Sequence, residues 1–168
     1  MKKIIQNLWR VVFVSVLVFC FQLVKADGGE VNLVVKNNGQ EITTLSVPLS
    51  AAGLAGVNDS GGAPHDIDAH SVLKVLSDAD AMSSEFNISS LIYYDSFGAF
   101  YLKCIEVGGD DLCDNWQYDV NGDSPSSGMD QSILSGGETV NVFFGSEEEE
   151  KEEILVEEIV EAEVSNSG

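Results

Sequence analysis

Two stretches that favour β-strands flank an Asn-Gly pair near the start of the chain. Residues 31–36 are rich in valine, and residues 41–49 alternate between two faces with a period of two. Asn38-Gly39 lies between them, and this pair favours the tight turn in which both central residues adopt positive φ. The sequence therefore predicts a β-hairpin over residues 31–49, with Pro48 at an edge or an end because it has no N–H to donate.

The rest of the chain predicts one helix and more strands. Residues 50–64 are small and polar and are interpreted as a loop. Apolar residues then recur at helical spacing, which predicts an amphipathic helix over residues 69–83 with Asp68 as its N-cap. Strands are predicted at 87–94, 99–107, 115–120 and 137–144, with turns at 95–98, 108–111 and Asn121-Gly122. The order β-β-α-β-β-β indicates an α+β fold of the β-grasp-like type, with the helix packed on a mixed sheet.

The first 26 residues have the pattern of a secretory signal peptide. Lys2, Lys3 and Arg10 precede or begin an apolar run from Val11 to Leu23, and Ala26 offers a small residue before Asp27 for cleavage. An uncleaved membrane anchor is the alternative, but the run is shorter than the roughly 20 residues that a spanning helix needs. We therefore expect a secreted, extracellular or cell-surface domain at 27–146 that is not inserted in a membrane after signal cleavage.

Acidic residues dominate the charge, with 28 Asp and Glu against eight Lys and Arg, for a net charge of −20. Such a chain lacks the cations that would displace the counterions of phosphate, so nucleic acid is not an expected partner. Glutamate occupies most positions from Glu147 to Glu163, so residues 147–168 are predicted to be a disordered acidic low-complexity tail or linker. Its apolar residues leave open a short helix face that docks on a partner.

The cysteines are consistent with export. Cys20 lies in the predicted signal, so the mature domain keeps the pair Cys104 and Cys113. In an oxidising compartment, an even pair close in sequence favours a disulfide over two free thiols. The predicted strands place the two cysteines on neighbours across a short loop, as a hairpin disulfide requires.

Motifs for catalysis and for metal binding are weak. The chain has no G-x-S-x-G elbow, phosphate loop or dinucleotide fingerprint, so an enzyme is not expected. His65 and His70 form one possible metal pair. A second candidate resembles a calcium loop, but Ser124 replaces the glycine that such a loop requires, Pro125 follows it, and a strand precedes the loop where a helix is usual. Its possible ligands are Asp119, Asn121, Asp123 and Asp130.

Several segments carry a family resemblance in order. Residues 115–122 (NWQYDVNG) resemble the W-x-Y-x-V-N-G signature of the transcobalamin-type C-terminal domain, a β-grasp family that binds soluble ligands. Residues 70–76 resemble its helix, residues 97–105 its aromatic strand, and residues 133–140 its run into the last strand. The resemblance covers about residues 29–145. Departures are the long segment at 50–66, the cysteine pair, and Glu138 where the family usually has Asp.

The resemblance implies a non-enzymatic binding module, with a cobalamin-like ligand possible and no cofactor required. Trp116 and Tyr118 share one face of their strand because they are two residues apart, so they are candidates for ligand contact as well as for core packing. Tyr93, Tyr94 and Phe97 are the other ligand candidates. The partner is thus a small soluble ligand or a surface protein. Alternatives are a structural or adhesive surface domain and a calcium-stabilised extracellular module.

Overall fold

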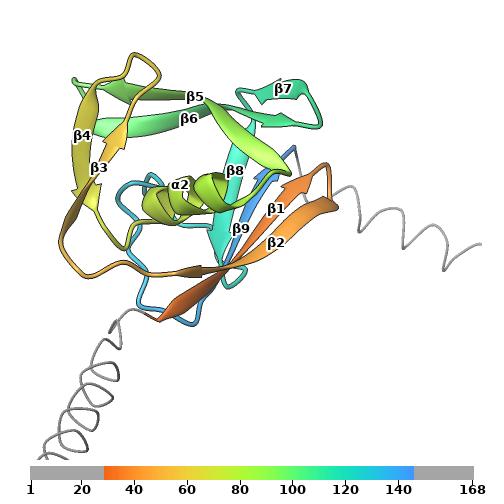
Figure 1. The fold of residues 1–168 in the computed structure, drawn as a ribbon, viewed down its shortest axis with the longest axis horizontal. Helices are drawn as coiled ribbons and strands as arrows, with labels where there is room; N and C mark the ends of the chain where they lie inside the picture. Colours follow the sequence, from red (N-terminus) through yellow and green to blue (C-terminus); the bar gives the residue numbers. More distant parts are fainter. Residues whose placement is uncertain (1–28, 146–168) are drawn as a thin grey trace, which may run out of the picture.

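The structure, a computed structural model, describes residues 29–145, which are mostly β-strand with one short helix (Figure 1). The predicted signal at 1–26 and the acidic tail at 147–168 lie outside these residues. The described part of the chain is of the α+β class. Its elements are β1 (Glu30–Asn37), β2 (Gln40–Pro48), β3 (Leu54–Asn58), β4 (Pro64–Asp68), α2 (Val72–Met82), β5 (Phe86–Tyr94), β6 (Ala99–Val107), β7 (Asp110–Cys113), β8 (Trp116–Val120) and β9 (Thr139–Phe144).

The main sheet has the strand order β2-β1-β9-β8. The β1–β2 hairpin is confirmed, and Asn38 and Gly39 both take positive φ, 46° and 77°, at its turn. The last strand, β9, lies beside the first and parallel to it, whereas the other neighbours in this sheet are antiparallel. The sheet is therefore mixed, as predicted. Pro48 is the last residue of the edge strand β2, where its missing N–H removes no ladder bond from the interior.

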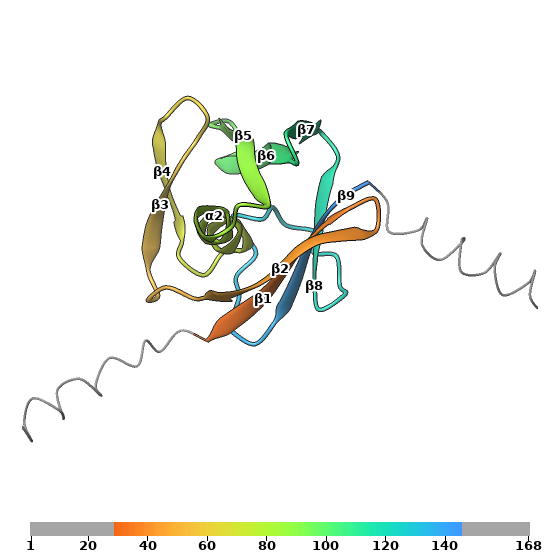
Figure 2. The ribbon, with the colours of Figure 1, turned by 45° about the vertical axis from the view of Figure 1, so that its right-hand side comes forward.

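The core lies between the main sheet and α2. Buried residues of α2, β1 and β9 belong to one hydrophobic cluster. In Figure 2, the β3–β4 hairpin and the β5–β6 strands flank the helix on its other sides. Burial of each such aliphatic side chain contributes about 1.5–3 kcal/mol relative to exposure. The core members with essentially no exposed surface include Val31, Leu33, Val35, Val72, Leu76, Ala79, Ile105, Val140 and Val142.

The loop predicted over residues 50–64 is wrong, because residues 54–68 form a second hairpin, β3–β4. Val57 and Ile67 each place a nearly buried side chain toward the core, with 6% and 7% of their surface exposed. Asp59 closes the turn by accepting a hydrogen bond from the Ala63 N–H over 2.8 Å. One buried residue per strand is too short an alternation to identify in a segment otherwise made of small and polar residues.

The predicted helix is confirmed, but its start is not. The helix begins at Val72, and its N-cap is Ser71, whose Oγ accepts a hydrogen bond from the Lys74 N–H. Asp68, the expected cap, is still the last residue of β4 and pairs with Leu54. Its carboxylate instead accepts a hydrogen bond from the His70 N–H. Pairing in the β3–β4 hairpin thus keeps residue 68 extended, and the helix starts only after the chain has left that hairpin.

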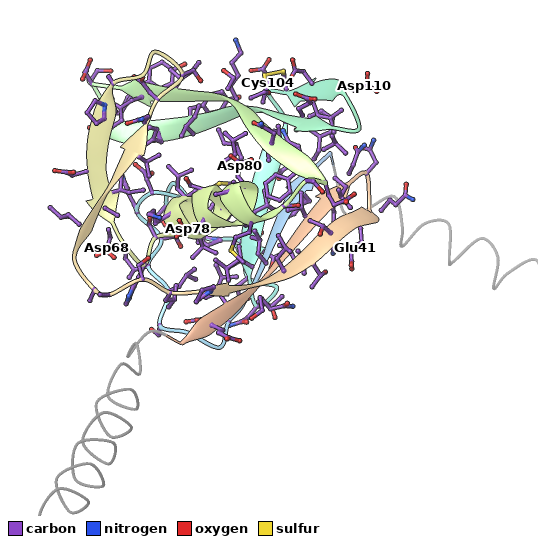
Figure 3. The ribbon with its side chains drawn as sticks, viewed as in Figure 1. Glu41, Asp68, Asp78, Asp80, Cys104 and Asp110 are labelled. Atoms are coloured by element: carbon purple, nitrogen blue, oxygen red, sulfur yellow. A yellow bond between two sulfur atoms is a disulfide. The ribbon has the colours of Figure 1, made fainter. Side chains whose placement is uncertain are left out.

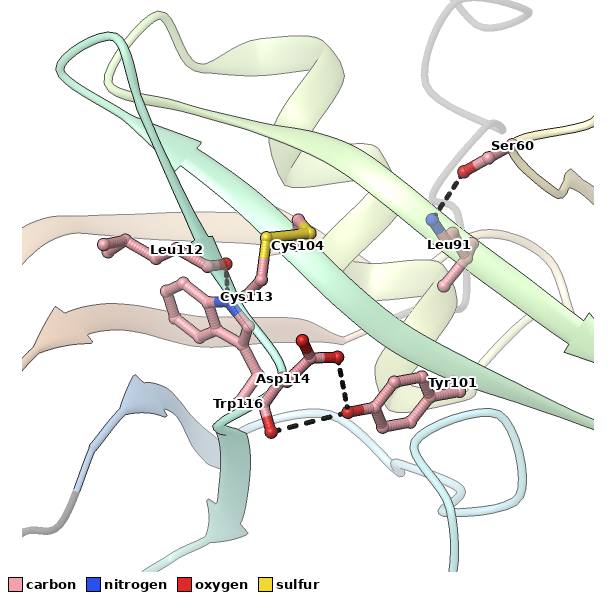
Figure 4. The surroundings of a disulfide bond; sticks show 8 residues. All are labelled: Ser60, Leu91, Tyr101, Cys104, Leu112, Cys113, Asp114 and Trp116. Atoms are coloured by element: carbon pink, nitrogen blue, oxygen red, sulfur yellow. Dashed lines mark hydrogen bonds between the residues drawn. A yellow bond between two sulfur atoms is a disulfide. The ribbon is translucent and has the colours of Figure 1, made fainter.

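A second sheet, β5-β6-β7, carries the disulfide. The turn predicted over 108–111 is only Gly108-Gly109, both with positive φ, because Asp110 already starts the short strand β7. Cys104 of β6 and Cys113 of β7 are directly opposite each other and are joined, with their Cα atoms 4.2 Å apart. The predicted disulfide is therefore confirmed (Figure 4).

A loop held by Glu138 leads the chain into β9. The two carboxylate oxygens of Glu138 accept hydrogen bonds from the N–H groups of Ser135 and Gly136, over 2.8 and 2.7 Å. Gly136 has a φ of +98°, and a Cβ on it would lie 2.7 Å from the Cα of Gly29. Loss of hydration raises the pKa of Glu138, but the backbone N–H groups of Ser135, Gly136 and Glu138 itself outweigh it, so the net pKa is lowered.

Replacing both disulfide cysteines, Cys104→Ser with Cys113→Ser, is expected to lower the free energy of unfolding by about 2–3 kcal/mol, because the closed loop restricts the unfolded chain. Urea unfolding of the parent and the double variant, each under non-reducing conditions, measures the difference. Reduced parent protein is the matched control and should unfold at the midpoint of the variant. Equal midpoints for oxidised parent and variant would contradict the prediction.

Glu138→Gln is expected to destabilise the protein by about 1 kcal/mol near neutral pH, a value reduced for the solvent exposure of this carboxylate. The folded pKa of Glu138 lies below its ordinary value of 4.5. The ionised group therefore contributes stability above that value, and the contribution is lost as pH falls through the folded pKa. Unfolding curves of parent and variant from pH 7 to 3 should converge at the acid end. If the difference in unfolding free energy between parent and variant does not change with pH, the charge of Glu138 does not contribute to that difference.

Candidate functional site

Trp116 and Tyr118 lie side by side on β8, and both are partly buried against the core. The Trp116 Nε1–H donates a hydrogen bond to the Leu112 carbonyl over 2.8 Å (Figure 4), and its ring centre is 5.4 Å from that of Phe144. The Tyr118 hydroxyl donates to the Ser127 carbonyl over 2.8 Å. Hydrogen bonds thus fix the positions of both rings. Fixed positions are consistent with a binding surface and with core packing alike.

These two rings also line a small pocket of about 160 Å³. The pocket lies where β6, β8, α2 and the segment at residues 128–129 meet, so both sheets contribute to it. Sequence reasoning identified the β8 side of this pocket and missed Met129 and Gly128, which no motif singled out. Its lining residues are Leu73, Phe100, Tyr101, Leu102, Trp116, Tyr118, Gly128 and Met129.

A buried carboxylate stands behind the wall of this pocket. Asp130 has 7% of its surface exposed, and its Oδ2 accepts a hydrogen bond from the Phe100 N–H over 3.0 Å. Its other oxygen, Oδ1, is buried and has no hydrogen-bond partner. That oxygen lies 2.7 Å from the position that a Cβ on Gly128 would take. Asp130 therefore ties the 128–130 segment to β6 and leaves one carboxylate oxygen unsatisfied next to the pocket.

The structure divides the other predicted aromatic residues between two places. Tyr93 faces inward, where its ring stacks on His65 with 3.7 Å between ring centres and meets the pocket residue Phe100 edge-on at 5.0 Å. Tyr94 and Phe97 are instead 45% and 78% exposed, with their ring centres 6.3 Å apart. Neighbouring residues on a strand point to opposite faces, so Tyr93 and Tyr94 cannot contact the same ligand group.

Tyr101 extends the exposed group, since its ring centre is 6.4 Å from that of Tyr94. We call Tyr94, Phe97 and Tyr101 the outer aromatic patch. The Tyr101 hydroxyl lies 3.4 Å from the carbonyl and from a carboxylate oxygen of Asp114 (Figure 4). Loss of hydration and the nearby Asp114 charge both raise the pKa of Tyr101. The phenol therefore stays protonated and can donate a hydrogen bond over the whole physiological range.

A larger and more polar pocket of about 450 Å³ separates the β3–β4 hairpin from α2 and β5. Ser60 and Leu91 both line it and are joined, because the Ser60 Oγ accepts a hydrogen bond from the Leu91 N–H over 2.7 Å (Figure 4). Burial raises the pKa of Asp80, which lines the pocket and accepts a hydrogen bond from the Ile88 N–H. Sequence reasoning missed this pocket because it exists only where residues 54–68 form a hairpin. Its polar lining includes Asn58, Asp59, Ser60, Ser77, Asp80 and Ser89.

Three of the four calcium candidates, Asp119, Asn121 and Asp130, have separate hydrogen-bond partners. Asp119 is nearly buried and accepts hydrogen bonds from the Gly122 N–H and the Asn141 side-chain amide. Asn121 accepts one from the Thr139 N–H, and Asp130 accepts the one from Phe100. Asn121 and Gly122 both have positive φ, 55° and 85°, so they form the expected turn. Between residues 29 and 145, no group of three or more His, Cys, Asp or Glu side chains is placed to hold a metal ion.

The two histidines are also apart in their contacts. His65 Nε2 lies 3.3 Å from a carboxylate oxygen of Asp59, whereas His70 Nε2 lies 2.8 Å from the Ser50 carbonyl oxygen. The two histidines, which the sequence suggested as a metal pair, therefore have different partners. His65 contacts the β3–β4 turn, and His70 contacts the segment after β2.

Comparison of this chain with protein-family models, curated proteins and solved structures finds no match. The resemblance to the transcobalamin-type domain therefore stays a prediction from the motifs in the sequence. Within residues 29–145, no helix is long and apolar enough to cross a membrane.

Asp119→Ala is expected to cost about 2–3 kcal/mol of unfolding free energy, because it leaves the Gly122 N–H and the Asn141 amide without their acceptor. Asp119→Asn, which keeps one acceptor oxygen, is the matched variant and should cost less. If Asp119 acts as this acceptor and not as a calcium ligand, the melting temperature of the parent should be the same in calcium and in a chelator. A large calcium-dependent rise in melting temperature that Asp119→Asn abolishes would support the calcium-stabilised module instead.

Proposed function

We propose that this chain is an exported, non-enzymatic binding module that holds an apolar group of a soluble ligand in the pocket beside Trp116 and Tyr118. The observation that carries the proposal is the pocket itself. Open space remains next to these rings, as a binding role for this face of β8 requires. Rigid aromatic side chains around an open space are the usual lining of small-molecule sites. The disulfide supports the export part of the proposal, since such bonds persist in oxidising compartments.

The arrangement of strands supports the proposed β-grasp-like assignment. The hairpin β1–β2 precedes the helix, and β9 returns to the centre of the sheet beside β1 and parallel to it. The helix packs on one face of this mixed sheet. In the proposed assignment, β3–β4 and β7 are additions to that frame.

The pocket volume limits what the site can enclose. Pockets that bury a drug-sized ligand are about 300–1,000 Å³, whereas an apolar cavity of about 150 Å³ holds a benzene ring. At about 160 Å³, this pocket suits a single ring or a branched alkyl group. A cobalamin-like ligand would thus insert one substituent and rest its remaining surface on the rim.

A structural or adhesive role is the second candidate, and the outer aromatic patch favours it. Phe97 is 78% exposed at the β5–β6 turn, next to Tyr94 and close to Tyr101. Exposed aromatic groups with a hydrogen-bonding edge are common in protein–protein contacts. In this alternative, a surface protein covers the patch, and the pocket has no ligand.

The test uses the full chain with Trp9→Phe, so that Trp116 is the sole tryptophan. The chain is titrated with soluble probes that span corrinoid, uncharged aromatic and cationic chemistry, namely cyanocobalamin, benzyl alcohol and choline. Calorimetry and Trp116 fluorescence should show saturable binding of at least one probe. Met129→Trp, which fills the pocket, should weaken that binding by about tenfold or more, equivalent to ~1.4 kcal/mol. This variant is measured by calorimetry alone, because it adds a second tryptophan.

Phe97→Ala is the matched control, because it removes an exposed ring from the outer aromatic patch and leaves the pocket lining unchanged. Its affinity for the bound probe should equal that of the parent. Binding that is lost in Phe97→Ala and kept in Met129→Trp would favour the adhesive alternative. If no probe binds at millimolar concentration while the protein is folded, the pocket proposal is contradicted.

A further inference from the structure

The pocket that carries the proposed function has aromatic rings in its lining and, behind that lining, the nearly buried carboxylate of Asp130, one oxygen of which has no hydrogen-bond partner. We infer that it binds a small organic cation, specifically an alkylated ammonium group on a free soluble molecule. This inference rests on the proposed function and names the ligand class for the same site. Three observations carry it: the state of Asp130, the rings around the pocket, and the charge of the chain.

The first observation is the carboxylate. Asp130 is more than nine-tenths buried, and the single N–H of Phe100 is the hydrogen bond it receives, at Oδ2. Its Oδ1 is sealed from solvent and has no hydrogen-bond partner. A buried negative charge is costly unless an opposite charge or donors compensate it. A cation in the adjacent pocket would supply that compensation, and it would act strongly because little water lies between the charges.

The placement of Oδ1 selects the kind of cation. It lies 2.7 Å from the position of a Cβ on Gly128, a residue that lines the pocket, and Asp130 itself is not among the lining residues, so this oxygen lies behind the wall and not in the open space. A ligand N–H in the pocket cannot reach it directly. An ammonium group that carries methyl groups instead of N–H bonds needs no such contact, because it is attracted by charge alone. The structure thus favours an alkylated ammonium over a primary amine.

The second observation is the aromatic lining. Phe100, Trp116 and Tyr118 line the pocket together with Met129. A cation over an aromatic face is attracted by the ring quadrupole, most strongly by tryptophan, and quaternary ammonium ligands are recognised in this way. The pocket volume of about 160 Å³ suits a group of this size. The methyl groups of such a cation also gain from apolar contact with Leu73 and Met129.

The third observation is the charge around the site. Residues 29–145 hold seventeen Asp and Glu against three Lys. The acids lie on many elements, and the labelled ones in Figure 3 reach from β2 and β4 to α2 and β7. The resulting negative potential concentrates cations near the surface and repels anions. A carrier with a phosphate group is therefore disfavoured, which points to a free cation and away from a phospholipid headgroup.

The test compares choline with 3,3-dimethyl-1-butanol, its uncharged isostere, on the full chain with Trp9→Phe. Shape and apolar surface are matched, so a difference in affinity reports the charge. Trp116 fluorescence should change saturably with choline, and the isostere should bind about tenfold more weakly or worse. Sodium chloride at matched ionic strength is the control for screening. Phosphocholine should bind more weakly than choline.

Asp130→Asn links the preference to the carboxylate. Asparagine keeps the size of the side chain and an oxygen that can accept from Phe100, but it removes the charge. The variant should lose the preference for choline and keep its affinity for the isostere, provided that near-ultraviolet circular dichroism shows native packing. Should this variant not fold, the comparison of choline with its isostere on the parent decides the question.

The outcomes separate this inference from the proposed function. Equal affinities for choline and the isostere would overturn the inference that the ligand is a cation, and would leave the proposed binding pocket supported. The same holds if cyanocobalamin or benzyl alcohol binds and choline does not. If phosphocholine binds as tightly as choline, the inference that the ligand is a free cation without a phosphate group is overturned. The absence of binding by every probe, with the protein folded, would contradict both proposals.

Discussion

The parallel pairing of the first strand with the last organises this fold. β1 and β9 bring Leu33 beside Val140 and Val35 beside Val142, and these side chains form the centre of the surface on which α2 packs. The paired residues are about a hundred positions apart in the sequence, so the entropy of closing that loop must be offset by burial. The β3–β4 hairpin and the β5-β6-β7 sheet then complete the enclosure of the helix.

The candidate site depends on this arrangement because no single element contains it. Trp116 and Tyr118 belong to the main sheet through β8, whereas Phe100 and Leu102 belong to the second sheet through β6. The segment at 128–130 bridges them, since Asp130 accepts a hydrogen bond from the Phe100 N–H. The pocket is therefore a junction between two sheets, and its shape is set by how the sheets are held against α2.

The acidity of the chain also has a local structural use. Carboxylates repeatedly accept backbone N–H groups at turns: Asp59 from Ala63, Asp119 from Gly122, and Glu138 from Ser135 and Gly136. Turns leave such donors without ladder partners, and a short acidic side chain satisfies them. In these turns, backbone N–H donors hold each carboxylate in place and compensate its charge. Asp130 differs, because one of its buried oxygens has none.

Features determined by neighbours in the sequence were predictable from it. The Asn38-Gly39 hairpin, the strands at 87–94 and 99–107, the body of α2, and the Cys104–Cys113 bond all follow from local periodicity, turn chemistry or short spacing. Only the tertiary structure decided the β3–β4 hairpin, the start of the helix, which of Tyr93 and Tyr94 faces inward, and the pocket with the unsatisfied oxygen of Asp130. Each of these depends on burial against segments far away in the chain, and burial leaves no local signal where a strand contributes a single core residue, as at Val57.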